Sequence, residues 1–225
     1  IIGADSKEIS IIEAILKSID PDNKFLKIET RIQPNLSRLF LEDVDVALIH
    51  NPKAISKESI KDLDKFLMEG GGVIWFQGEY MEVQYDSDLF SKIGFPKVDM
   101  LVNSGQGIFK TNISSESSDV LQEIRARDLT REMPDVFKYA KSDVSPKTKI
   151  HLELNNNDPF LVEFSRGSGS VFYFSSLLDL RWNDLPMRGI VVPLLFRLII
   201  LSGTDEVNTS AVLVDESKWI SIEES

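Results

Sequence analysis

The sequence contains no cysteine and only two histidines, His50 and His151, among its 225 residues. The absence of cysteine excludes disulfides, thiolate nucleophiles and cysteine-ligated metal sites, and it leaves the redox compartment undetermined. Basic residues are also scarce, because 25 lysines and arginines stand against 36 aspartates and glutamates, for a formal net charge of -11. A surface of this sign repels phosphate backbones and anionic lipids. We therefore expect no nucleic-acid partner.

Long apolar runs are missing as well. The longest, "IVVPLLFRLIIL" from Ile190 to Leu201, is interrupted by Pro193 and Arg197 and falls short of the roughly 20 residues that cross a bilayer. It predicts a buried helix. The chain opens "IIGADSKEIS", without Met or a signal-type segment, which we interpret as the start of a piece excised from a longer protein, with a processed chain as the alternative.

Strand and helix patterns alternate in the first part of the chain. Asp5 or Ser6 can cap one helix, and Ser56 can cap another that ends at a run of three glycines. This β-α-β-β-α-β order predicts a parallel sheet with helices on its faces, because parallel strands need crossover connections. The strands are predicted at 1–3, 24–30 ("KFLKIET"), 44–50 ("VDVALIH") and 73–76 ("VIWF").

The pattern changes between Glu79 and Arg166, where short alternating runs predict a β-rich insertion. "KIHLEL" (149–154) and "FLVEF" (160–164) flank the turn residues "NNNDP", which favours an antiparallel hairpin. "SVFYFSS" (170–176) then returns to the parallel sheet. The domain is therefore expected to span 1–204, followed by an extension at 205–225 with strand-like alternation, which we interpret as a tail or the start of a further β module.

Two glycine-rich stretches could suggest a phosphate loop, but both run into a strand where a dinucleotide-binding loop opens a helix. Gly167 and Gly169 are better explained by a tight hairpin turn. The G-x-S-x-G pattern of acyl-transfer serines is absent. The acidic pairs Asp43/Asp45 and Asp86/Asp88 are interpreted as solvated charges. We propose no metal site and no cofactor from the sequence.

Polar side chains follow the predicted parallel strands at their carboxyl ends, where open α/β folds bind ligands. Two interpretations stand for these groups. The first, which we favour, makes them structural: a hydrogen-bonded histidine, a tryptophan that packs the loop, and an arginine paired with a carboxylate. The second makes them a ligand-binding edge. The residues concerned are His50, Asn51, Gln77, Glu79, Ser175, Asp179, Arg181 and Trp182.

Two segments carry a family resemblance. "VDVALIHNPKAISKESIKDLDKFLMEGGGVIWFQGE" resembles the class I glutamine amidotransferase-like fold in its non-enzymatic branch, and "SRGSGSVFYFSSLLDLRWNDLPMRGIVVPLLFRLI" is similar to the closing segment of such domains in bacterial membrane proteins of the aerotolerance (Bat-type) group. The resemblance implies a flavodoxin-like, doubly wound parallel sheet. It also implies a soluble module of a membrane-anchored protein, facing the periplasm, with the cytoplasm as the alternative; the membrane is reached only through segments outside this chain.

Active members of that fold need an elbow cysteine and a histidine–glutamate pair. Here the elbow region is Phe76, Gln77 and Gly78, and the last parallel strand ends in Ser175 and Ser176, so covalent amide hydrolysis has no mechanism. We expect a non-enzymatic interaction or sensing domain with a protein partner, which includes other domains of the same protein. The alternatives are a carbohydrate or small-ligand binding domain that uses the sheet edge, and a hydrolase with a non-cysteine acid/base site.

Overall fold

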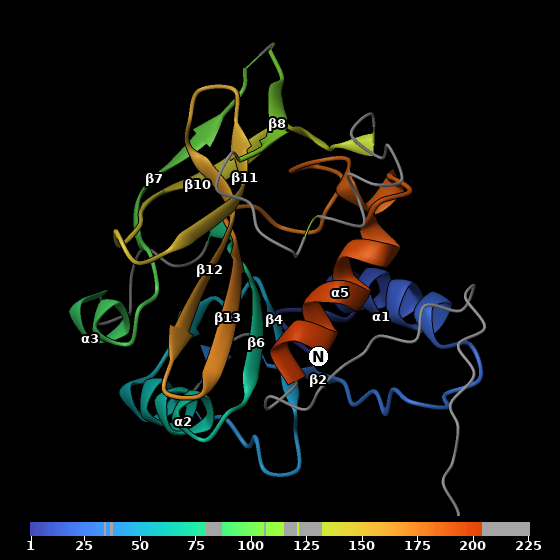
Figure 1. Cartoon of the computed structure of the whole chain (residues 1–225), viewed down its shortest axis with the longest axis vertical. Coiled ribbons are helices and arrows are strands. Elements are labelled where there is room, and N and C mark those ends of the chain that lie inside the picture. The colour runs from blue at the N-terminus through green and yellow to red at the C-terminus, as the bar shows by residue number, and fades with distance from the viewer. Residues whose placement is uncertain are drawn as a thin grey trace, which may run out of the picture.

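The computed structural model describes residues 1–33, 35–36, 38–79, 87–105, 107–114, 121 and 132–203. One half of its central sheet is parallel, as the sequence predicts (Figure 1). The strands Val46–His50, Gly72–Phe76 and Gly169–Phe174 are mostly apolar and buried on both faces, which is typical of parallel sheets with helices on both sides. The edge strand Arg31–Ile32 is exposed. Across the sheet the order is β2 (Arg31–Ile32), β1 (Ile2–Gly3), β4 (Val46–His50), β6 (Gly72–Phe76) and β13 (Gly169–Phe174).

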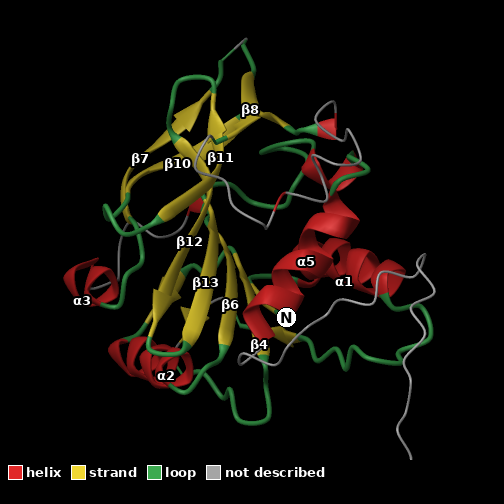
Figure 2. Ribbon diagram, viewed as in Figure 1, coloured by secondary structure: helices red, strands yellow, loops and turns green. Residues whose placement is uncertain are grey.

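Helices cover both faces of this parallel half (Figure 2). α1 (Ser6–Ile19) and α5 (Val191–Gly203) pack on one face, whereas α2 (Lys57–Met68) and the short α3 (Ser87–Lys92) lie on the other. The carboxylate of Asp5 accepts the main-chain N–H of Glu8 at 2.9 Å, and Oγ of Ser56 accepts that of Ser59 at 3.0 Å. Both predicted caps are therefore confirmed.

The two faces of the sheet hold separate hydrophobic cores. Phe76 and Phe174 stack with 4.8 Å between ring centroids on the face of α1 and α5. Trp75 and Tyr173, their neighbours along the same strands, point into the core under α2. Successive side chains of a strand alternate between faces, and each fully buried large apolar side chain stabilises the fold by roughly 1.5–3 kcal/mol. The two cores therefore fix which way every strand faces.

The other half of the main sheet is antiparallel. β11 and β12 form the hairpin that the sequence predicts. Gly167 has φ of 61° in the turn between β12 and β13, a left-handed conformation that glycine adopts without cost, so the hairpin-turn interpretation of this glycine holds. Beyond β13 the sheet continues with β12 (Pro159–Arg166), β11 (Lys149–Leu154), β8 (Phe109–Ile113) and β9 (Asp135–Val136).

Two small sheets and one short helix complete the described fold. β7 and β10 pair antiparallel beside the main sheet, and β3 and β5 pair parallel. A 3-10 helix at Leu185–Met187 precedes α5. Within the described ranges, none of the helices has the length and apolarity that a membrane crossing requires. The paired strands are β7 (Lys97–Asn103) with β10 (Lys138–Asp143), and β3 (Asn35–Leu36) with β5 (Ala54–Ile55).

The predicted strand at 24–30 is wrong in its position. Residues 25–29 are extended, with half-buried Leu26 and Ile28 between exposed neighbours, but the paired strand begins only at Arg31. The reason lies at Asp20, whose carboxylate accepts the main-chain N–H groups of residues 24, 25 and 26 at 2.8–3.0 Å. These contacts tie residues 24–26 to the end of α1, and hydrogen bonds to the first residue of the chain begin only where Ile1 N donates to Glu29 O at 2.5 Å and Arg31 N donates to Ile1 O at 2.8 Å. The predicted extension 205–225 and the turn at Asp86 lie outside the described residues.

Candidate functional site

The carboxyl ends of the parallel strands meet at one edge of the sheet, and a buried polar cluster lies there. Glu8 stands in the first turn of α1, because that helix begins directly after β1 at the same edge. Its Oε2 lies 3.3 Å from Nδ1 of His50, and Nδ2 of Asn51 donates to its two oxygens at 3.0 and 3.2 Å. All three side chains are buried. A buried carboxylate requires such partners, because burying an unpaired charge is costly.

An ion pair closes the solvent side of this cluster. Arg181 donates to both carboxylate oxygens of Asp179, from Nε at 2.9 Å and from Nη2 at 2.8 Å, and its Nη2 lies 3.9 Å from Oε1 of Glu8. The guanidinium hydrogen bonds hold the pKa of Asp179 below its usual range, although burial acts against them. The same pairing raises the pKa of Arg181. Both groups therefore stay charged and engaged with each other.

Asn51 owes its position to Gly78. The backbone of Asn51 has φ of 51°, which asparagine tolerates better than most residues. A Cβ atom at position 78 would come within 1.8 Å of Oδ1 of Asn51. Only glycine therefore allows the chain that follows β6 to pass Asn51 while the Asn51 side chain hydrogen-bonds to Glu8.

Gln77 and Ser175 do not join this cluster. Strand alternation places them on the face of Trp75 and Tyr173, opposite to His50, whose ring lies 5.6 Å from Phe76. Oε1 of Gln77 accepts the indole N–H of Trp75 at 3.1 Å. Ser175 also lies two strands away from His50, a separation of about 10 Å at the usual spacing. Its hydroxyl is therefore out of reach of the imidazole.

Glu79 and Trp182 belong to a third group, centred on Lys138. Nζ of Lys138 lies 2.9 Å from Oε2 of Glu79 and 4.6 Å from the centroid of the Trp182 ring. Trp182 is only 2% exposed, and its carbonyl accepts the main-chain N–H groups of Phe137 and Lys138. This burial favours packing over an open stacking plate for a sugar.

The arrangement has limited chemical capacity. Nε2 of His50 has no hydrogen-bond partner in the part of the chain that the structure describes, so His50 and Glu8 form a base with an orienting carboxylate. A covalent mechanism also needs a nucleophile within hydrogen-bond reach of that base. Of the two serines that the sequence places at this edge, Ser175 lies on the other face, and the Ser176 hydroxyl donates to the Lys138 carbonyl at 2.9 Å and accepts from Nδ2 of Asn183 at 2.8 Å. The remaining acidic groups at the edge are paired with cations.

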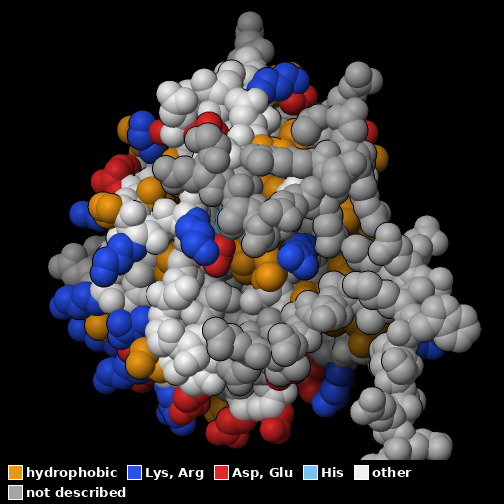
Figure 3. Space-filling view, in the orientation of Figure 1, with side chains coloured by type: hydrophobic (Ala, Val, Ile, Leu, Met, Phe, Trp, Pro, Cys, Tyr) orange, Lys and Arg blue, Asp and Glu red, His pale blue; other side chains and the backbone are white. Residues whose placement is uncertain are grey.

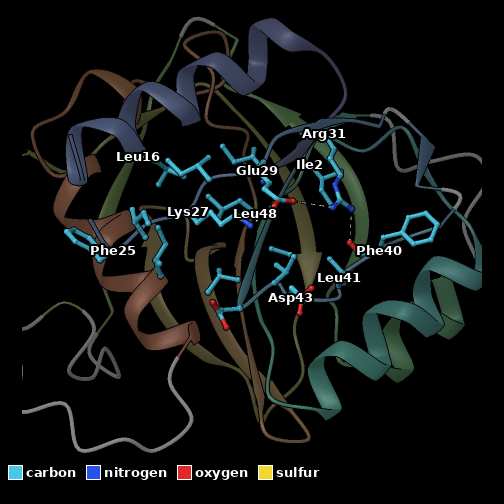
Figure 4. Close-up of a pocket in the computed structure, with 18 residues that line it drawn as sticks. Ile2, Leu16, Phe25, Lys27, Glu29, Arg31, Phe40, Leu41, Asp43 and Leu48 are labelled. Atoms are coloured by element: carbon cyan, nitrogen blue, oxygen red, sulfur yellow. Dashed lines mark hydrogen bonds and ion pairs between the residues drawn. The ribbon is translucent and has the colours of Figure 1, made fainter. Parts of the chain in front are cut away.

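A second feature, a groove, lies on the face of α1 and α5 at the β2 end of the sheet. It holds about 280 Å³, just below the range of roughly 300–1,000 Å³ that is typical of small-molecule pockets. Figure 4 shows Phe25 and Phe40 at its two ends. β1 and β4 form its floor, and its walls are Leu16 of α1, Ile199 of α5, the extended segment 25–29 and residues 40–45.

Large apolar side chains are exposed around this groove. Phe25 is 58% exposed and Phe40 63% exposed, and Phe196 of α5, which is 39% exposed, contacts the Phe25 ring edge-on at 6.2 Å between centroids. Hydrophobic side chains also show at the surface where Figure 1 places α5 (Figure 3). Contiguous exposed apolar surface marks interaction sites more often than isolated residues do. The groove is therefore the better candidate for contact with a partner.

Sequence reasoning missed Glu8 and the groove. Glu8 had one available signal, since an acidic residue in the first turn of a helix that follows a parallel strand lies at the carboxyl edge. The groove had no local sequence signal, because residues from five separate parts of the chain line it. The segment "KFLKIET" was predicted as a strand, whereas the structure leaves Phe25 exposed at the end of the groove.

Comparison with known proteins yields no matching family model and no matching curated protein. Several solved structures share the fold. A cytoplasmic protein from Salmonella typhimurium LT2 superposes with a TM-score of 0.67 at 13% identity, over 87% of this chain and 87% of its own. A ThuA-like protein from Parabacteroides merdae ATCC 43184 has a TM-score of 0.60 at 13% identity, over 90% and 88%. A β-galactosidase from Bacillus circulans sp. alkalophilus has a TM-score of 0.58 at 10% identity, over 86% of this chain and 27% of the enzyme chain. At these identities the similarity shows a shared mixed α/β fold.

Proposed function

We propose that this chain is a non-catalytic interaction module on a class I glutamine amidotransferase-like scaffold. The parallel strands support the scaffold, because their order across the sheet is second, first, third, fourth and fifth along the chain, as in flavodoxin-like folds. In this proposal residues 79–166 are a β-rich insertion into that scaffold. The module binds an extended apolar peptide segment of a partner in the groove over β1 and β4, beside the segment 25–29.

One observation carries the proposal: ionisable groups at the carboxyl edge are paired with each other, while the groove exposes apolar side chains. Glu8 pairs with His50, Asp179 with Arg181, and Glu79 with Lys138. Pairs of this kind leave little free charge for substrate chemistry. Burial of apolar area is the dominant favourable contribution to most protein association, and exposed phenylalanines provide such area.

The shape of the groove favours an extended peptide over a globular or small-molecule ligand. Residues 25–29 form one wall in extended conformation, and no described residue hydrogen-bonds to the main-chain N–H of Lys27 or Ile28. An extended peptide could add its own main-chain hydrogen bonds to such a segment, as in β-strand addition. Its apolar side chains would then fill the hollow over β1 and β4.

A peptide library displayed on phage tests this proposal with the full chain. We expect selected peptides to contain at least three consecutive apolar residues. Phe40→Asp should weaken their binding at least tenfold, about 1.4 kcal/mol, whereas Met187→Asp, an equally apolar and exposed position outside the groove, should leave it unchanged. Selection of no peptide, or equal weakening by both substitutions, would overturn the proposal. So would hydrolysis of an ester or amide substrate that His50→Ala abolishes.

A small-ligand site at the carboxyl edge is the second candidate. It is favoured by two buried atoms without a partner in the described residues, Nε2 of His50 and Oδ1 of Asn51. Both atoms accept hydrogen bonds, so each needs a donor, which a ligand with two O–H or N–H groups or a water molecule could provide. A panel of monosaccharides in a thermal-unfolding assay tests this candidate. A rise in midpoint that His50→Ala removes supports it, and no rise with any sugar refutes it.

The place of the module in a larger, membrane-anchored protein of the aerotolerance group stays a hypothesis. The β-galactosidase supports only the general idea that this fold can be one part of a larger protein, since the matching region is 27% of the enzyme chain. The full reading frame tests the rest. Transmembrane segments that flank this region and a signal for export would support a periplasmic module, and their absence would refute it.

A further inference from the structure

We infer that the segment bound in the groove is basic as well as apolar, with lysine or arginine residues beside its apolar run. This inference rests on the proposed function of the groove and names the chemical class of the partner. The apolar side chains fill the hollow over β1 and β4, and the cationic side chains pair with carboxylates of the wall 40–45.

Carboxylates on the wall 40–45 have no counter-ion among the described residues. Asp43 and Asp45 line the groove, and Glu42 precedes them in the same wall. All three side chains are exposed, and none of them forms an ion pair or a hydrogen bond with a residue that the structure describes. This wall therefore presents three uncompensated negative charges within four positions.

Charged groups on the opposite wall are already engaged. Oε1 of Glu29 lies 3.2 Å from Nζ of Lys27, and its Oε2 lies 3.4 Å from Nη2 of Arg31. The amino group of Ile1 donates to the carbonyl of Glu29 at 2.5 Å. Figure 4 shows Asp43 across the groove from Glu29 and Arg31. Among the described groove residues, the carboxylates that lack a counter-ion therefore lie on one side of the hollow, which favours a cationic group at a defined place along the bound segment.

The formal net charge of -11 supports the same class of partner. A field of this sign repels a second copy of the chain and an anionic lipid surface, and it steers a cationic segment toward the groove. Complementary charges at the rim of an interface act mainly on the association rate and on specificity, whereas burial of apolar area is the dominant favourable contribution to association. We therefore expect Asp43 and Asp45 to set how fast the segment binds, and Phe25 and Phe40 to set how slowly it leaves.

Three synthetic peptides test the inference with the full chain. They share one core of four alternating valines and leucines and are flanked at both ends by two lysines, two serines or two glutamates. At low salt the lysine peptide should bind at least tenfold more tightly than the glutamate peptide, with the serine peptide between them. Near 1 M salt, where the screening length falls to about 3 Å, this difference should shrink to less than about threefold.

Asp43→Asn combined with Asp45→Asn tests whether the carboxylates of the groove cause this preference, with surface plasmon resonance as the measurement of both rates. Asp43 has φ of 60°, which asparagine also tolerates, so the substitution removes charge without straining the turn. The double variant should lower the association rate of the lysine peptide about fivefold or more and change its dissociation rate less than about twofold. The matched control, Glu58→Gln combined with Glu69→Gln, removes the same charge from exposed positions at the two ends of α2, on the other face of the sheet, and should change neither rate by more than about twofold.

The outcomes separate the inference from the proposed function. Equal affinity of the three peptides, or an equal effect of the two double variants, overturns the basic class of partner while apolar peptide binding itself stands. Binding of none of the three peptides overturns the proposed function as well. Dimers that form with rising protein concentration and that Phe40→Asp abolishes would identify a second copy as the occupant and also overturn the inference.

Discussion

The side-chain amide of Asn51 donates to both carboxylate oxygens of Glu8, which lies 43 positions earlier in the sequence. The same carboxylate faces Nδ1 of His50. One buried carboxylate therefore joins the first turn of α1 to the end of β4. This contact lies at the carboxyl edge of the parallel strands, where open α/β folds bind ligands. Here it stabilises the packing of α1 against β4.

Glu8→Ala should destabilise the protein by about 1–3 kcal/mol, because it leaves Nδ2 of Asn51 and the imidazole of His50 buried without their acceptor. Urea denaturation at neutral pH measures the loss. Glu58→Ala is the matched control, since Glu58 also lies in the first turn of a helix but is exposed. Equal effects of the two substitutions would mean that helix-end charge, and not the buried cluster, accounts for the loss.

Gly78→Ala should also destabilise the protein, by about 1–3 kcal/mol, because the new Cβ would come within 1.8 Å of Oδ1 of Asn51. Asn51→Gly in the same chain should remove most of this extra cost, since glycine tolerates the positive φ and has no side chain to collide. Gly189→Ala, where a Cβ meets only ordinary contacts at 3.6 Å, should stay within about 0.5 kcal/mol. Strictly additive effects at positions 51 and 78 would contradict the assigned collision.

The stability contributed by Glu163 should depend on pH. The hydrogen bond that Nε2 of His151 donates over 2.9 Å holds the pKa of Glu163 below its ordinary value, against the effect of burial. A carboxyl with a lowered pKa in the folded state stabilises the protein above its unfolded pKa of about 4.3, and this contribution is lost as pH falls through the folded value.

Glu163→Gln should therefore cost about 1.5–3 kcal/mol near pH 6 and much less near pH 3. Urea denaturation at several pH values checks this trend. Glu69→Gln, at an exposed pair with Lys65, should change stability by less than about 0.5 kcal/mol at either pH. A cost for Glu163→Gln that stays constant across the range would contradict the pKa assignment.

Trp182→Ala should cost about 3–5 kcal/mol, the usual range for removing a buried aromatic side chain. The ring is buried, and it packs beneath Nζ of Lys138 while its carbonyl holds the start of β10. Trp182→Phe should retain about half of this stability, because a smaller ring keeps part of the packing. Near-UV circular dichroism with urea denaturation provides the measurement. A loss below about 1 kcal/mol for alanine would show that the ring is exposed in solution.

Much of the fold could be predicted from the sequence because its signals are local. Continuous apolar runs mark β4, β6 and β13, since a strand buried on both faces has no polar side. Asp5 and Ser56 mark helix starts through a hydrogen bond that spans three residues. The strand at 24–30 was misplaced because a contact outside the local pattern, the Asp20 carboxylate, holds residues 24–26.

The sequence by itself determined that the chain has no cysteine nucleophile, that Gln77 and Gly78 follow the apolar run 73–76, and that polar groups end the parallel strands. Only the tertiary structure decided which of these groups meet. His50 and Ser175 end strands of the same sheet, yet they point to opposite faces, because one position along a strand reverses the direction of a side chain. Glu8 reaches His50, and Ile199 reaches the wall of residues 25–29, only through packing between distant segments. Such pairings depend on strand register and helix position, which no short stretch of sequence encodes.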